Sequence, residues 1–158
     1  MLKRINWGTL AISVLIPLVV GGISALLTMN AMEEFSSLDQ PPLSPPGWLF
    51  PVVWSLLYIL MGIAFYRVVR SGRDNEQKLS AIKVYFLQLA INFLWSILFF
   101  NFGLYTFSVV WLALLLITVV MTAVKFYKID RISGYLFIPY IIWILFAAYL
   151  NIGIAVLN

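Results

Sequence analysis

Residues 104–124, LYTFSVVWLALLLITVVMTAV, contain no charged side chain. This run is about 20 residues long, which at 1.5 Å per residue is the length of helix that crosses the hydrocarbon core of a bilayer. Four further apolar runs of similar length occupy residues 7–28, 48–66, 81–100 and 133–156. None of them shows the strict alternation of a barrel strand, so the chain is predicted to form five transmembrane α-helices.

Composition points to the same class of protein. Of 158 residues, 63% are hydrophobic and only 10% are charged, whereas about 25% of the residues of a soluble domain are charged. Such a chain has too few polar side chains to cover a core in water. We therefore expect a single all-α membrane domain over residues 1–158. The net charge of +4 without a basic face argues against nucleic-acid binding.

The charged residues between the runs predict the orientation of the chain. All ten Lys and Arg residues precede the first run or lie around the second and fourth connections, whereas the first connection carries only acidic residues. Five helices therefore place every basic residue on one side of the membrane. The positive-inside rule then predicts a cytoplasmic N-terminus and an external C-terminus.

The first run also fits a signal peptide, because Lys3 and Arg4 precede it. It is longer than a usual signal core, however, and no clear A-x-A cleavage site follows it. Small residues recur along it at four-residue spacing, a pattern that favours close helix packing in lipid. We therefore expect this helix to be retained. The small residues are Ser13, Pro17, Gly21 and Ala25.

Residues 29–47 form the first connection and contain QPPLSPPG at 40–47. Proline fixes φ and restricts the preceding residue, so this segment is predicted to be stiff and extended. It is either a rigid spacer or a lid over the outer end of the bundle. The lid would consist of Pro41, Pro42, Leu43, Pro45 and Pro46.

Aromatic and amide side chains recur at spacings of three and four within three of the runs. Residues at these spacings share one helix face. Buried amides need hydrogen-bond partners, so these faces are predicted to point into the bundle. Each residue alone fits a packed core, but the whole set predicts a ligand pocket in the outer half. The faces hold Pro51, Trp54 and Tyr58; Tyr85, Gln88, Asn92, Trp95 and Phe99; and Pro139, Tyr140, Trp143, Ala147 and Asn151.

The remaining tryptophans, Trp7, Trp48 and Trp111, are predicted to be interfacial or to face lipid. The chain has no His or Cys, and no carboxylate lies within a run. A metal site and general acid–base catalysis inside the membrane are therefore not expected.

The landmarks along the runs resemble those of the translocator protein family, also called tryptophan-rich sensory proteins and formerly the peripheral-type benzodiazepine receptor. The resemblance covers nearly the whole chain. It implies a five-helix fold, usually homodimeric, that binds porphyrins such as protoporphyrin IX, isoquinoline carboxamides and benzodiazepines. It also implies a location in a bacterial cell membrane. The landmarks are Pro17 with Gly21-Gly22; Pro45-Pro46-Gly47-Trp48; Trp54, Tyr58 and Met61-Gly62; Gln88 to Asn92, Trp95 and Phe99-Phe100; and Pro139-Tyr140, Trp143, Phe146-Ala147 and Leu150-Asn151.

The resemblance also implies roles for single residues. Trp54 and Trp143 match tryptophans linked to light-dependent porphyrin breakdown in bacterial members, and Asn92, Ala147 and Asn151 match positions in or near the pocket. Three lid positions, Glu34, Gln40 and Leu43, depart from the family pattern, as does Phe107, which stands where mammalian relatives have a pocket tryptophan. Tyr149 is followed by no Lys or Arg, so the C-terminal cholesterol motif of those relatives is missing.

Three functions therefore remain open. The first is a sensor-type membrane protein that binds porphyrin, with no tightly bound cofactor, in a pocket of Trp54, Tyr58, Asn92, Trp95, Tyr140, Trp143, Ala147 and Asn151. The second is a light-dependent porphyrin-degrading enzyme that uses Trp54 and Trp143. The third is a transporter of tetrapyrroles or other hydrophobic molecules, which is disfavoured because no ionisable residue lies inside the spans. In each case the expected partners are the small molecule, the bilayer and a second copy of the chain.

Overall fold

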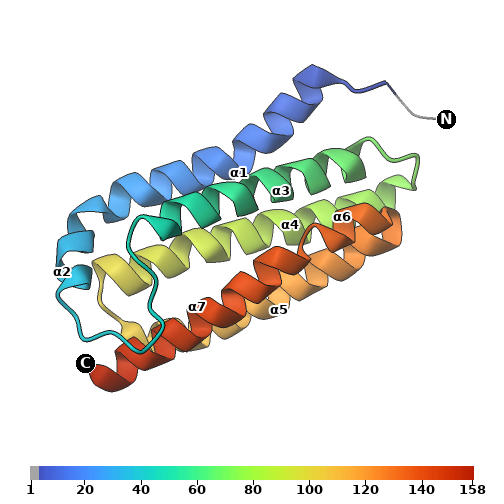
Figure 1. The fold of residues 1–158 in the computed structure, drawn as a ribbon. Helices are drawn as coiled ribbons and strands as arrows, with labels where there is room; N and C mark the ends of the chain where they lie inside the picture. The colour runs from blue at the N-terminus through green and yellow to red at the C-terminus, as the bar shows by residue number, and fades with distance from the viewer. Residues whose placement is uncertain (1–3) are drawn as a thin grey trace.

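The computed structural model describes residues 4–158, and all regular elements among them are helical. Five stretches are long and apolar enough to span a membrane, which confirms the predicted all-α membrane bundle. Figure 1 shows the long helices side by side, with α2 and the C-terminus at one end and the α3–α4 connection at the other. The elements are α1 (Trp7–Thr28), η1 (Met29–Ala31), α2 (Met32–Ser36), α3 (Leu49–Val69), α4 (Asn75–Ser96), η2 (Ile97–Asn101), α5 (Tyr105–Ile129), α6 (Arg131–Tyr135) and α7 (Ile138–Leu157).

Two helices extend beyond the apolar runs that predict them. α4 begins at Asn75 rather than near Ala81, and α5 ends at Ile129 rather than near Val124. The added turns contain Lys, Glu and Gln, which favour helix even in water. Hydropathy therefore marks only the membrane-embedded part of each helix, and intrinsic helix propensity extends it.

Two other segments differ from the prediction. The fifth apolar run is not one helix, because α6 ends at Tyr135 and α7 begins at Ile138. Pro139 lies in the first turn of α7 and has no N–H to continue the ladder from α6, so the helix restarts there. The predicted loop 29–47 is likewise helical over residues 29–36 and irregular only from residue 37.

The first spanning helix lies directly against α3. A Cβ atom on Gly62 of α3 would lie 2.5 Å from the Cα of Val14 and 2.7 Å from the carbonyl oxygen of Ser13. Only glycine therefore permits the two backbones to approach this closely. Gly21 of α1 makes room in the same way for the ring of Tyr58.

The small-residue stripe predicted on α1 holds for only part of its length. Ser13 and Pro17 are buried and Gly21 faces Tyr58, but Ala25 is exposed. A four-residue step overshoots the helical turn by about 40°, so the stripe rotates away from the bundle. Near the end of α1 the buried positions are Ser24 and Thr28, and the hydroxyl of Thr28 donates to the carbonyl oxygen of Ser24 at 2.9 Å.

An ion pair joins α3 to the junction between α5 and α6. Arg67 Nε donates to Asp130 Oδ2 at 2.6 Å and its Nη2 donates to Oδ1 at 3.1 Å. Asp130 also caps α6, where it accepts hydrogen bonds from the backbone N–H and the hydroxyl of Ser133. The Ser133 hydroxyl lies within hydrogen-bond distance of the Ala64 carbonyl oxygen as well, at 3.1 Å. This cluster ties the end of α3 to α6.

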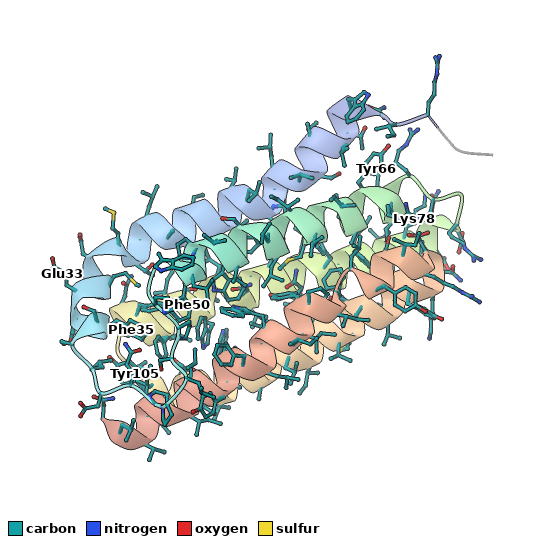
Figure 2. All side chains as sticks on the ribbon, viewed as in Figure 1. Glu33, Phe35, Phe50, Tyr66, Lys78 and Tyr105 are labelled. Atoms are coloured by element: carbon teal, nitrogen blue, oxygen red, sulfur yellow. The ribbon has the colours of Figure 1, made fainter. Side chains whose placement is uncertain are left out.

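The charged side chains lie at the two ends of the bundle, and the described Lys and Arg residues are all at one of these ends. Figure 2 shows Lys78 and Tyr66 at the end that holds the α3–α4 connection, and Glu33 and Tyr105 at the other. We call these the basic end and the acidic end. Lys3, one of the residues used to predict orientation, lies outside the described residues. The cytoplasmic placement of the basic end stays a prediction.

Replacement of Gly62 by alanine is expected to destabilise the α1–α3 contact by about 1–3 kcal/mol, because the added methyl group meets backbone atoms that cannot rotate away. Gly22→Ala is the matched control, since a Cβ at Gly22 meets nothing within 4 Å. Thermal unfolding in detergent should show a lower midpoint for Gly62→Ala only. Equal midpoints for the two variants would contradict the close contact.

The Arg67–Asp130 pair is expected to make stability depend on pH. The hydrogen bond from Arg67 lowers the pKa of Asp130, so its stabilisation is complete above the ordinary carboxyl pKa of about 4 and is lost as the pH falls below that value. Asp130→Asn should lower the unfolding free energy by about 1 kcal/mol at neutral pH. It should also reduce the loss of unfolding free energy that occurs as the pH falls below about 4. The control is Asp74→Asn, because Asp74 is exposed and its side chain caps no helix. This variant should change neither the unfolding free energy at neutral pH nor its dependence on pH.

Candidate ligand site

Four aromatic side chains from α3 and α7 meet in the middle of the bundle. Trp54 stacks on Tyr58 with ring centroids 5.7 Å apart. Its ring also meets Tyr140 edgewise at 6.1 Å and Trp143 edgewise at 6.5 Å. Tyr58 and Tyr140 are buried, whereas Trp54 and Trp143 are half-buried. We call Trp54, Tyr58, Tyr140 and Trp143 the aromatic cluster.

A buried hydrogen-bond chain adjoins this cluster on the side of α4. Asn92 Nδ2 donates to the Tyr140 hydroxyl at 2.7 Å, and that hydroxyl donates to Gln88 Oε1 at 3.0 Å. Gln88 Nε2 contacts Met61 Sδ at 3.7 Å. All four residues are buried, so each polar group needs a partner within the bundle. The chain links α3, α4 and α7.

A second polar group lies nearer the acidic end. Trp95 Nε1 donates to Asn151 Oδ1 at 3.1 Å, and Asn151 Nδ2 donates to the Tyr105 carbonyl oxygen at 2.9 Å. Trp95 also stacks on Phe99, with ring centroids 5.4 Å apart. Ala147, one helical turn before Asn151 on α7, is buried.

The residues predicted for the pocket thus fall into two groups. Trp54, Tyr58, Tyr140 and Trp143 meet through their rings, and Asn92 joins them through the Tyr140 hydroxyl. Trp95, Ala147 and Asn151 lie closer to the acidic end. The amides of Asn92 and Asn151 already hydrogen-bond within the protein, so the groups most available to a ligand are the ring surfaces. The prediction that Pro51 and Pro139 point into the bundle is wrong, because both lie in the first turn of a helix and are exposed.

A groove of about 490 Å³ opens beside the aromatic cluster, between α3 and α7. Trp143 lies in its wall, and Leu56 and Ile142 on its rim are exposed on the surface that faces lipid. The indole Nε1 of Trp143 is buried and has no hydrogen-bond partner among the described residues. The surface of the groove is apolar, and the Trp143 donor is buried rather than exposed in it. The lining residues are Val53, Leu56, Leu57, Leu60, Pro139, Ile142, Trp143 and Phe146.

The proline-rich segment is fastened to the last turns of α7. Pro41 is buried against Gly153, where an added Cβ would lie 2.5 Å from its ring. Tyr149 donates its hydroxyl to the Pro42 carbonyl oxygen at 2.6 Å. Asn158 Nδ2 donates to the Asp39 carbonyl oxygen at 2.9 Å, and the Asp39 N–H donates back to Asn158 Oδ1 at 3.2 Å. These contacts hold the segment across the acidic end (Figure 1).

The rest of the predicted lid is more open. Pro45 is half-buried, whereas Pro42 and Pro46 are exposed. Leu43 is 84% exposed and has a φ of 68°, a left-handed conformation that is strained for leucine. The tip of the segment therefore presents an apolar side chain to its surroundings while its base is fixed to α7.

A contact of Phe35 at this end was not predicted from sequence. Phe35 of α2 packs against Phe99 and Phe100, with ring centroids at 5.7 and 5.2 Å, and Figure 2 shows it within the acidic end. The only feature of the sequence that could have indicated this contact is Phe35 itself, a single aromatic residue in a segment predicted to be a loop. Farther into the bundle, Trp111, which is predicted to be interfacial or to face lipid, is half-buried, and its Nε1 donates to the Ile91 carbonyl oxygen of α4 at 2.9 Å.

The chemistry open to this site is limited by its side chains. The chain has no His or Cys, and no cluster of potential metal ligands occurs among residues 4–158. Ring contacts and dispersion contacts are what the groove provides. These contacts suit a flat, largely apolar molecule.

Comparison with known proteins identifies the family of this chain. A sequence profile of the TspO/MBR family matches residues 13–157. Protein CrtK of Rhodobacter capsulatus is 40% identical over 87% of this chain and 85% of its own length. The tryptophan-rich protein TspO of Archaeoglobus fulgidus is 37% identical over 94% and 96%, and the translocator protein of Sus scrofa is 30% identical over 87% and 82%. This chain is therefore an integral membrane protein that belongs to the TspO/MBR family.

Proposed function

We propose that this protein is a sensor-type membrane receptor that binds a porphyrin, protoporphyrin IX or a close analogue, against the aromatic cluster. The observation that carries the proposal is the half-buried pair Trp54 and Trp143 beside an apolar groove of about 490 Å³. The names of two relatives, tryptophan-rich sensory protein and translocator protein, support a role in sensing or moving a small molecule.

A porphyrin suits this groove for two physical reasons. Its macrocycle is flat and apolar, so it gains from contact with indole and phenol rings and with the leucine side chains of the wall. Its edge carries carboxylates, which accept hydrogen bonds, and the Trp143 N–H, which is buried without a described partner, would become available to one of them if the indole ring turned toward the groove. Formation of that bond would satisfy a buried donor that is otherwise costly to leave unpaired.

The buried polar chain need not change when the ligand binds. Asn92, Gln88 and Tyr140 satisfy one another, so a molecule held by the groove would leave their hydrogen bonds intact. The interaction would then be reversible and driven mainly by apolar contact, as expected of a receptor without a permanent cofactor.

A second candidate function follows from the geometry of the two tryptophans. Their rings are perpendicular with centroids 6.5 Å apart, close enough for an electron to pass between them. A light-excited porphyrin beside them would take one electron from an indole ring, and the reduced pigment would add dioxygen. Cleavage of the O–O bond would leave both oxygen atoms in the opened macrocycle, and the electron would return to the indole radical. Light-dependent degradation of the bound pigment is the corresponding activity.

The groove can be tested with a substitution that fills it. Ile142 lies on the groove wall and is 62% exposed to lipid, so Ile142→Trp should fold normally while occupying the ligand space. We expect the affinity for protoporphyrin IX, measured in the dark from the porphyrin absorption band, to fall at least about 10-fold, equivalent to about 1.4 kcal/mol.

The matched control is Ile152→Trp. Ile152 lies on the same helix and is 48% exposed, but it does not line the groove. The affinity of the Ile152→Trp variant for protoporphyrin IX should equal that of the unsubstituted protein. Equal affinity of Ile142→Trp and Ile152→Trp would place the porphyrin elsewhere, and absence of any spectral change with micromolar porphyrin would refute the receptor proposal.

Illumination in air tests the second candidate. At saturating porphyrin, the double variant Trp54→Phe, Trp143→Phe should lose pigment absorbance several-fold more slowly than the unsubstituted protein, because phenylalanine is far harder to oxidise than indole. The double variant Trp7→Phe, Trp48→Phe removes two exposed tryptophans and should bleach at the normal rate. If bound pigment bleaches no faster than free pigment, the protein is a receptor and not a photo-oxidative enzyme.

A further inference from the structure

A second hollow, separate from the ligand groove, lies at the basic end. It has a volume of about 560 Å³ and is placed where α5 ends and α6 begins. Three cationic side chains line it, each from a different segment: Arg73 from the α3–α4 connection, Lys128 from α5 and Arg131 from α6. All three are exposed. The fold therefore brings Arg73 beside two cations, Lys128 and Arg131, that are distant from it in sequence.

The single carboxylate in this hollow does not neutralise these charges. Asp130 is held by Arg67 through two hydrogen bonds, at 2.6 and 3.1 Å, and by Ser133. Lys128 and Arg131 make no hydrogen bond or ion pair with another described residue. Arg73 is positioned by one bond, from its Nε to the Ile129 carbonyl oxygen at 3.4 Å. The hollow thus keeps a positive charge with unused donors.

Apolar side chains adjoin the cations. Tyr127 is 41% exposed and Ile132 is 51% exposed, and both line the hollow. Tyr127 meets Tyr135 edgewise, with ring centroids 5.6 Å apart. Exposed tyrosines at the end of spanning helices are typical of the level of lipid headgroups. A free phosphate would contact only the cations, whereas a phospholipid would also contact the apolar side chains of Tyr127 and Ile132.

We propose that this hollow binds the phosphate headgroup of an anionic phospholipid from the leaflet at the basic end. Arg73, Lys128 and Arg131 contact the phosphate oxygens, and Tyr127 and Ile132 contact the glycerol and the first part of the acyl chain. Because Lys128 and Arg131 lie on either side of the Asp130 cap, a bound lipid would bridge α5 and α6.

The experiment is a titration of the detergent-purified protein with phosphatidylglycerol, monitored by native mass spectrometry and by thermal stability. The double variant Lys128→Gln, Arg131→Gln should bind the lipid about 30-fold more weakly, equivalent to about 2 kcal/mol for the loss of two cations. The charge-conserving variant Lys128→Arg, Arg131→Lys should retain most of the affinity, which separates loss of charge from loss of fold.

The matched control removes the same charge outside the hollow. Arg4→Gln, Lys83→Gln neutralises two exposed cations of the basic end that do not line the hollow, and it should keep the lipid affinity. An equal loss in both double variants would show general charge attraction and overturn the proposal. The same titration is repeated with two further compounds, glycerol phosphate and the zwitterionic lipid phosphatidylcholine. Binding of glycerol phosphate as tight as that of phosphatidylglycerol would assign the hollow to a soluble phosphate, and equal binding of the two lipids would remove the role of the charge.

Discussion

The hydroxyl of Tyr140 accepts a hydrogen bond from Asn92 and donates one to Gln88, and the arrangement of the bundle depends on this chain. In hydrocarbon a buried amide without a partner costs several kcal/mol, so α4 must face α7 at this depth and in this rotation. The second polar group, Trp95 with Asn151, fixes the same two faces nearer the acidic end. Together they set the direction in which the remaining side chains of α4 and α7 point.

The contact between α3 and α7 is of a different kind. At the basic end Arg67 and Asp130 hold α3 to the α5–α6 junction through charge-assisted hydrogen bonds. In the middle of the bundle the two helices meet mainly through aromatic rings, and a groove remains between them. Ring contacts are weaker and less directional than a buried hydrogen-bond chain. The groove that we propose for a flat ligand therefore lies between α3 and α7, where the contacts are weaker, and not between α4 and α7.

Much of this architecture could be predicted from the residues. The apolar runs gave five spanning helices, and the three-and-four spacing of Gln88, Asn92 and Trp95 correctly placed them inside the bundle. Individual side-chain partners could not be predicted, because spacing defines a face but not its neighbour. Trp111 illustrates the limit. Its sequence context fits a lipid-facing indole, but the path of α5 beside α4 brings its N–H to the Ile91 carbonyl oxygen.

By itself, the sequence determined the membrane class of the protein, the number of spans and the inward face of α4, because hydrophobic length and helical periodicity are local properties of the chain. Only the tertiary structure decided which polar groups pair, leaving the Trp143 N–H without a described partner and a groove beside it. It alone also brought Arg73, Lys128 and Arg131 around one hollow. The reason is physical: pairing and cavities depend on the relative rotation and crossing of helices, which are set by contacts between residues far apart in the chain.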